Sequence, residues 1–274
     1  MKLIVDINSL EILDECLDNI DVVVVGYVDL AYDSGMIVEF DELVSLCDKV
    51  HQAGKEVWVN ARRIVHENDV SLINQRISEV LNTLVDGIMY TDLFFYMALE
   101  NTSLLKVYTP TTYVTSKYDL EVLKKKHDIV LASPEVSIDE LEQMASMNSI
   151  CYLFGQMSIF HSRRKLLTNY YEYRLWMYDS DKKYLLKEEL REDYLPIKET
   201  KLGTSIYLEG FYSSINYVNR LQKFEFGLIS GLFLTPSELV SVINAYVRSD
   251  ESLIDVKLVR GALDNKTILL KGDD

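Results

Sequence analysis

Short runs of apolar, β-branched residues recur at fairly regular intervals along this chain. Runs of this length that are apolar on both faces are typical of parallel strands covered on both sides. They predict eight strands, at KLIVDI (2–7), DVVVVGY (21–27), EVWVNA (56–61), DGIMY (86–90), KVYTP (106–110), DIVLAS (128–133), SICYLFG (149–155) and FEFGLISG (224–231).

Stretches with the spacing of an amphipathic helix separate most of these runs. Ser9 and Ser137 are suitable N-caps, Gly54 is a C-cap signal, and Pro236 stands where a first helical turn begins. The predicted helices cover residues 9–19, 39–53, 68–84, 114–126, 137–147 and 236–248. Eight strands alternating with helices predict an α/β fold, a (β/α)8 TIM-type barrel, with a doubly wound open sheet as the alternative.

Two segments depart from the strand–helix alternation. Residues 174–224 form an insertion between strands seven and eight, with short antiparallel strands and then a helix at about 213–223. Residues 249–274 contain alternating runs broken at Asp264–Asn265 and predict a C-terminal hairpin. We expect a single barrel domain, residues 1–274, that carries both additions.

The charge of the chain restricts the partners that it can bind. The formal net charge is −15, so the general basic footprint of a duplex-binding protein is missing. Contact with nucleic acid would need a local patch, such as the three cations at 163–165. No apolar run has the length of a membrane span, and the N-terminus lacks a secretion signal, so we expect a cytoplasmic protein without membrane contact.

The cysteines and histidines do not form a metal-binding pattern. Cys16, Cys47 and Cys151 are far apart, lie in apolar segments and include no CxxC, so we expect all three in the core. The four histidines show no i, i+4 pairing. We therefore predict no metal site.

Loops after the carboxyl ends of the strands form the functional face of such a barrel. This rule nominates polar residues of several kinds: Asp6, Asn8, Tyr27, Asp29, Asn60, Arg62, Arg63, Tyr90, Asp92, Thr109, Thr111, Ser133, Glu135, Gln156, His161, Ser162, Arg163, Arg164 and Ser230. The predicted substrate-binding set is Asn60, Arg62, Arg63, Glu135, Gln156, Ser162, Arg163 and Arg164, with no catalytic residue assigned.

The four arginines of this set could form a guanidinium pocket for a carboxylate or phosphate. Each of them could instead pair with an acidic neighbour, and Asp6 and Glu135 could cap helices. The aromatic residues between Tyr170 and Tyr178 could pack the insertion or stack on bases.

Three segments resemble the collagenase-like peptidase U32 family. They are GQMSIFHSRRKLLTNYY from Gly155, YLLKEELREDYLPIKETKLGTSIYL from Tyr184, and FGLISGLFLTPSELVSVINAYV from Phe226. This specific resemblance covers roughly residues 130–250, and the family fold is a (β/α)8-type barrel. Residues 155–170 are then the loop after strand seven and the start of its helix.

The resemblance also implies a function. Many members bind an iron–sulfur cluster through four cysteines near these motifs and take part in hydroxylation of tRNA wobble uridine, ribosomal RNA or ubiquinone precursors. Here Lys165 follows the paired arginines, and no cysteine falls in the family's positions, so we expect no cluster and no other cofactor.

The chain resembles the short, cluster-free branch of the family. We therefore expect a cytoplasmic component of tRNA wobble-uridine 5-hydroxylation that acts with a homologous, cluster-bearing partner and meets tRNA or an anionic small molecule. A U32-type peptidase, and a non-catalytic barrel subunit that binds and stabilises a partner, are the alternatives.

Overall fold

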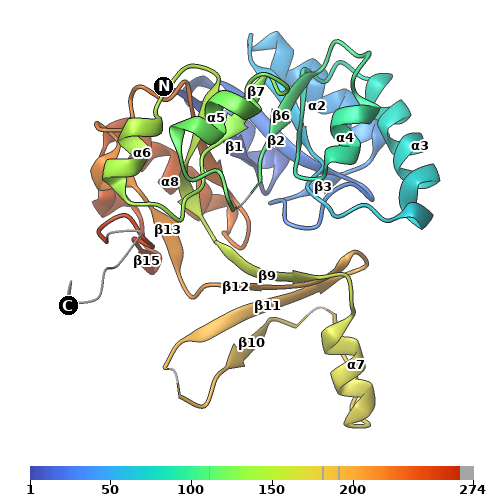
Figure 1. Cartoon of the computed structure of the whole chain (residues 1–274). Helices are drawn as coiled ribbons and strands as arrows, with labels where there is room; N and C mark the ends of the chain where they lie inside the picture. Colours follow the sequence, from blue (N-terminus) through green and yellow to red (C-terminus); the bar gives the residue numbers. More distant parts are fainter. Residues whose placement is uncertain (111, 181, 191, 266–274) are drawn as a thin grey trace.

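Eight parallel strands close into a barrel in the computed structural model, which describes residues 1–110, 112–180, 182–190 and 192–265 (Figure 1). The strands pair in the order β14-β1-β2-β4-β5-β6-β7-β8, and β8 closes the ring on β14. They are β1 (Lys2–Asp6), β2 (Val22–Tyr27), β4 (Glu56–Asn60), β5 (Gly87–Tyr90), β6 (Leu105–Tyr108), β7 (Ile129–Leu131), β8 (Ser149–Gly155) and β14 (Phe226–Ser230). The fold is a (β/α)8 TIM-type barrel, as predicted, and each of the eight apolar runs contains one strand.

Helices connect the strands on the outside of the barrel. They are α2 (Phe40–Gln52), α3 (Val70–Leu81), α4 (Leu93–Ala98), α5 (Lys117–Leu123), α6 (Ile138–Met144) and α8 (Pro236–Arg248). Reciprocal capping bonds between Ser137 and Glu140 start α6, and Pro236 opens α8, as the sequence predicts. The sequence predicts one helix over residues 9–19, but the structure has three short helical turns there: η1 (Leu10–Ile12), α1 (Leu13–Cys16) and η2 (Leu17–Asn19).

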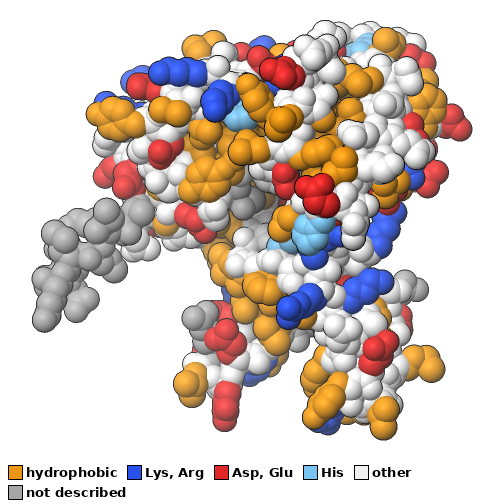
Figure 2. All heavy atoms as spheres, turned by 45° about the vertical axis from the view of Figure 1, so that its right-hand side comes forward, with side chains coloured by type: hydrophobic (Ala, Val, Ile, Leu, Met, Phe, Trp, Pro, Cys, Tyr) orange, Lys and Arg blue, Asp and Glu red, His pale blue; other side chains and the backbone are white. Residues whose placement is uncertain are grey.

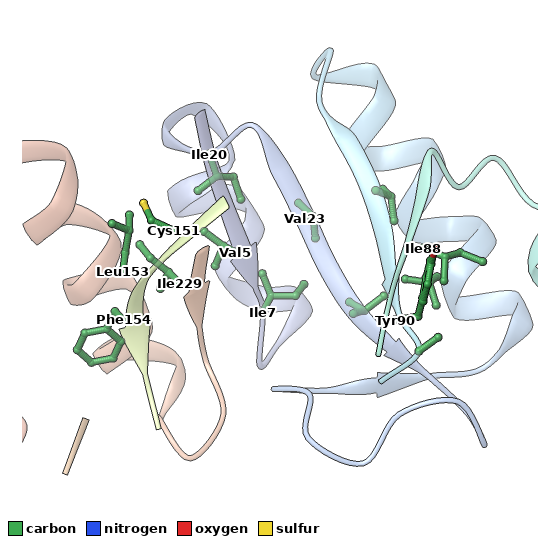
Figure 3. Close-up of a cluster of buried hydrophobic side chains, with 14 of the residues drawn as sticks. Val5, Ile7, Ile20, Val23, Ile88, Tyr90, Cys151, Leu153, Phe154 and Ile229 are labelled. Atoms are coloured by element: carbon green, nitrogen blue, oxygen red, sulfur yellow. The ribbon is translucent and has the colours of Figure 1, made fainter. Parts of the chain in front are cut away.

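The hydrophobic core has two parts, which explains why the strands are apolar on both faces. Inside the ring, Ile4, Val24, Trp58 and Leu228 pack together with less than 3% of each residue exposed. Outside it, alternate strand residues such as Val5 and Val23 pack under the helices (Figure 3). The three cysteines are buried, as predicted.

The chain leaves the barrel directly after β8 and builds a second, antiparallel sheet below it (Figure 1). We call this four-stranded sheet the mouth sheet. It contains β9 (Ser158–Ser162), β10 (Tyr184–Lys187), β11 (Tyr194–Thr200) and β12 (Gly203–Tyr207), and α7 (Leu166–Tyr173) projects from it between β9 and β10. The loop predicted for residues 155–170 is therefore wrong over β9, which pairs with β12.

Gly155 makes this departure possible. Its φ is +149°, and a Cβ atom there would lie 2.2 Å from the Tyr152 hydroxyl and 2.8 Å from the Cβ of Ser230. A larger residue would clash with both side chains, so the turn out of the barrel depends on glycine.

The chain returns to the barrel through β13 (Phe211–Ser213), which pairs with β8 and with β15 (Leu258–Val259). The helix predicted at about 213–223 is reduced to one turn, η4 (Ile215–Tyr217), and η5 (Glu251–Leu253) follows α8. The C-terminal hairpin predicted for residues 249–274 lies partly outside the described residues and stays a prediction. In the described part of the chain, no helix has the length and apolar character to cross a membrane.

The two tryptophans provide a matched test of the inner core. Trp58 is fully buried inside the ring, whereas Trp176 is 52% exposed. We expect Trp58→Ala to lower the free energy of unfolding by about 3–5 kcal/mol and Trp176→Ala to lower it by less than ~1 kcal/mol. Urea unfolding followed by circular dichroism measures both, and similar values for the two variants would contradict the two-part core.

Candidate functional site

Polar residues replace apolar ones where the inner faces of several strands reach the carboxyl end of the barrel. Asp6 ends β1, Asn60 ends β4 and Ser230 ends β14, and all three are buried. The parallel register places Asp6 beside Ser230. The functional face is therefore polar at its base, as the barrel rule predicts.

Asp6 is held by donors from a neighbouring loop and strand. The Ser34 hydroxyl donates to it at 2.5 Å, the Gly35 N–H at 3.1 Å and the Ser230 hydroxyl at 3.4 Å. Burial nevertheless dominates these bonds and raises the pKa of Asp6 to about 7. This carboxyl can therefore hold or release a proton near neutral pH.

A buried ion pair lies next to Asp6. The Nη2 atom of Arg62 is 3.0 Å from Oδ2 of Asp33, and both residues are less than 10% exposed. Burial lowers the pKa of Arg62, but the charges of Asp33 and Asp6 outweigh burial and raise it, so the guanidinium stays charged. The backbone N–H of Arg62 also donates a hydrogen bond to Oδ1 of Asn60 at 3.0 Å, which fixes the start of the loop after β4.

The ion pair leaves hydrogen-bonding atoms unused. Nε of Arg62, Oδ1 of Asp33 and the hydroxyl of Tyr207 are buried and have no hydrogen-bond partner among the described residues. All three residues line one cavity of about 40 Å³, which we call the mouth cavity. Buried polar atoms without partners are unfavourable, so their gathering around one cavity indicates a binding site for a polar group.

The mouth cavity lies between the barrel and the mouth sheet. Glu135 and Gln156 follow β7 and β8, whereas Ser158 and Tyr207 come from the mouth sheet. Apolar side chains complete the wall: Leu131, Pro134, Tyr152, Met157 and Leu232. The volume suits a few water molecules or one edge of a larger ligand.

His161 connects the mouth sheet to a loop of the barrel and is itself held by a neighbouring strand of the sheet. His161 of β9 stacks on Tyr32 with ring centroids 4.0 Å apart, and its Nδ1 lies 2.8 Å from the Ser205 hydroxyl of β12. Burial lowers the pKa of His161. The neutral ring is therefore favoured, which suits a stacked structural contact.

The structure separates the predicted binding residues into two groups. Arg62, Glu135 and Gln156 line the mouth cavity, and Asn60 supports Arg62. Arg63 and Arg163 instead converge on Asp69, with the Arg63 Nη2 atom 2.8 Å from the carboxylate and Arg163 in direct contact with it. Ser162 accepts a bond from the Arg164 N–H at 3.2 Å, and the Arg164 side chain is exposed.

The predicted pocket of four guanidinium groups is therefore not formed. Consecutive residues point in different directions, so Arg62 turns toward the cavity while Arg63 turns toward Asp69. Pairing with acidic neighbours, the alternative interpretation, describes Arg63 and Arg163. Arg62 also pairs with Asp33, although it lines the cavity. Ligand binding by Arg63, Ser162, Arg163 and Arg164 stays a prediction, and Thr111 lies outside the described residues.

Three important residues of the mouth cavity were not in the predicted set. Asp33 belongs to the loop after β2. The feature of the sequence that could have identified it is that it is the second carboxylate, after Asp29, in a loop that follows a strand. Tyr152 points inward from β8, and Tyr207 ends β12. The approach of Tyr207 depends on the mouth sheet, which the strand count does not position.

Among the described residues, no cluster of three or more His, Cys, Asp or Glu side chains is arranged to hold a metal ion. Burial raises the pKa of Cys16 and of Cys47 to about 11, which disfavours the thiolate form that clusters require.

Comparisons with known proteins agree with this fold. The family model described as Peptidase family U32 matches residues 9–184. The match begins well before the specific resemblance at 130–250 and ends at the second of the three motifs. The barrel also superposes on the structure of the U32 peptidase Mk0906 with a TM-score of 0.53 and 14% identity, covering 84% of this chain and 92% of that one.

A curated relative is similar in sequence as well. It is tRNA hydroxylation protein P2 of Bacillus subtilis (strain 168), which is 24% identical over 221 residues. The alignment covers 75% of this chain and 71% of the relative.

The titration of Asp6 gives a test of the site's electrostatics. Its folded-state pKa of about 7 lies above the value of an exposed Asp, so its contribution to stability is present at low pH and is lost as pH rises. Relative to Asp6→Asn, the free energy of unfolding of the wild type should fall by on the order of 4 kcal/mol between about pH 4 and pH 8. Urea unfolding across this range measures the difference.

The exposed carboxylate Asp18 supplies the control. Asp18→Asn should follow the wild-type pH profile within about 0.5 kcal/mol. A pH-independent difference between wild type and Asp6→Asn would show that Asp6 does not titrate as its burial requires.

Proposed function

This chain belongs to peptidase family U32, and on that premise we propose that it is a cytoplasmic component of tRNA wobble-uridine 5-hydroxylation. The observation that carries this proposal is its 24% identity, over most of both chains, to a tRNA hydroxylation protein. The cavity at the barrel mouth, which polar side chains line, is consistent with substrate binding and supports the proposal.

The chemistry of the mouth cavity suits one edge of a nucleobase. Oδ1 of Asp33 accepts hydrogen bonds and Nε of Arg62 donates them. A uracil ring presents N–H and C=O groups side by side on one edge. The two unused atoms could therefore pair with such an edge, while the apolar wall contacts the ring.

Hydroxylation at C5 replaces a C–H bond by a C–O bond and therefore requires an oxygen donor and a two-electron oxidation. The iron–sulfur cluster that the family suggests would need four thiolate ligands, but this chain has three cysteines, all buried and on separate elements. These residues do not fit the cluster. We propose that a homologous, cluster-bearing partner supplies the redox chemistry and that this chain contributes substrate binding.

Because these cysteines do not fit a cluster, a second candidate function is a non-catalytic subunit that binds and stabilises its partner. Peptide hydrolysis has weaker support. The hydrogen-bonded pair of Ser205 and His161 resembles an activated nucleophile, but Ser205 is 3% exposed and has little access to a peptide. The solved U32 peptidase shares the fold at 14% identity, which does not extend to its activity.

Two tyrosines separate function from stability. The hydroxyls of Tyr207 and Tyr212 are both buried and without hydrogen-bond partners among the described residues, but Tyr207 lines the mouth cavity and Tyr212 does not. Replacing either by Phe removes an unsatisfied group, so each change should alter the free energy of unfolding by less than about 1 kcal/mol.

The functional outcome should differ between them. A strain lacking the gene should lose 5-hydroxyuridine-derived nucleosides from tRNA, measured by mass spectrometry of digested tRNA. Tyr212→Phe should restore them fully, and Tyr207→Phe should restore about a tenth or less, as expected when a hydrogen bond to the bound substrate is removed. Unchanged nucleosides in the deletion strain would refute the proposed function.

A further inference from the structure

A groove of about 680 Å³ adjoins the mouth cavity. It runs between the mouth sheet and the loop before α8, and Gln156 and Leu232 line both hollows. Figure 2 shows that the part of the molecule below the barrel is hollowed and carries several Lys and Arg side chains. A ligand in the groove would therefore lie next to the cavity whose walls carry the unpartnered atoms.

The groove presents positive charge on an acidic protein. Lys182 and Lys183 are exposed, and Lys182 lies 3.6 Å from the Asp179 carboxylate in a solvent-exposed ion pair. Lys198 lies deeper, with its ammonium group over the Phe233 ring at 5.7 Å from the centroid. Burial lowers the pKa of Lys198, although the negative charges of Asp33 and Asp6 oppose this effect.

The carboxylates of the groove are already engaged. Glu199 accepts bonds from the Leu167 N–H at 2.8 Å and the Thr168 N–H at 3.3 Å. Glu209 pairs with Lys257 at 2.6 Å. Among the described residues, four lysines and only these two glutamates line the groove, so its lining carries a net positive charge and attracts anions although the chain as a whole carries a net charge of −15.

Aromatic rings accompany these cations. Tyr178 and Tyr184 stack at 5.6 Å between ring centroids, and both residues line the groove together with Phe233. Ammonium groups beside aromatic rings in a continuous groove are the combination with which proteins bind single-stranded nucleic acid.

We propose that this groove binds a single-stranded RNA segment, with phosphates at Lys182 and Lys183 and one base directed into the mouth cavity. The proposal rests on the proposed function and extends it by naming the form of the RNA and the surface that holds it. An unpaired loop exposes its bases to such a surface, whereas a duplex keeps them stacked inside. The cavity, with its unused donor and acceptor, receives the edge of the selected base.

The experiment measures fluorescence anisotropy with the purified full chain. The probes are a labelled anticodon stem–loop RNA with uridine at the wobble position and a fully paired RNA duplex of the same length. Lys182→Glu/Lys183→Glu is compared with Lys125→Glu/Lys126→Glu, which makes the same charge change at the opposite end of the barrel, after α5.

We expect the groove variant to bind the stem–loop about tenfold or more weakly, with a salt-dependence slope lower by about 0.7 for each phosphate that the variant no longer neutralises. The distant variant should stay within about twofold of the wild type, because salt screens charges beyond a Debye length. The wild type should prefer the stem–loop over the duplex. Lys182→Ala/Lys183→Ala repeats the test without introduced carboxylates, and circular dichroism confirms that each variant is folded.

Three outcomes would overturn the groove proposal: no binding of the stem–loop by the wild type at low salt, equal weakening in the two charge-reversal variants, or equal affinity for the duplex. They can be told apart from failure of the proposed function. If the groove does not bind RNA but the deletion strain loses the modification, the function stands and the binding surface is elsewhere. If the groove binds RNA and the modification persists without the gene, the surface stands and the proposed reaction does not.

Discussion

The barrel mouth depends on one guanidinium group that is paired with a buried carboxylate. Arg62 offsets the charge of Asp33 directly and acts on Asp6 through space. Removing Arg62 alone would leave the charge of Asp33 buried without a countercharge. Replacing both residues of the ion pair by apolar residues of similar volume could nevertheless give a protein that is at least as stable. Stability alone therefore does not account for this arrangement. Unpartnered atoms on three residues around one cavity are instead what the proposed binding site would require.

The sequence predicted the barrel well because its strands are buried on both faces, and burial of this kind leaves continuous apolar runs such as VVVVGY. The mouth sheet was harder to predict. Its first strand, β9, has exposed Ile159 and Phe160 and pairs with β12 more than forty residues later. Pairing with β12, rather than an alternation of apolar and polar residues in β9 itself, specifies this strand. The sequence pattern of residues 155–170 therefore predicts a loop.

The site was predicted by position rather than by geometry. The barrel rule nominated Asp6, Arg62, Glu135, Gln156 and Ser230, all of which lie at the mouth. It did not determine which arginine of an adjacent pair would face the cavity, because that depends on Asp33 and Asp69, which lie on different loops. Tyr207 reaches the cavity only through the fold of the mouth sheet, so the chain pattern around it carried no sign of its role.

The acidity of the chain takes on a different meaning once the groove is considered. A polyanion is repelled by most of this surface and attracted by the lysines of the mouth sheet, so net negative charge and local positive charge act together to select its position. The carboxylate of Asp33 continues this logic inward. It disfavours entry of a phosphate into the cavity, whereas a neutral base with a donor edge can pair with its unused oxygen. The charge pattern thus orders a nucleotide with its phosphate outside and its base inside.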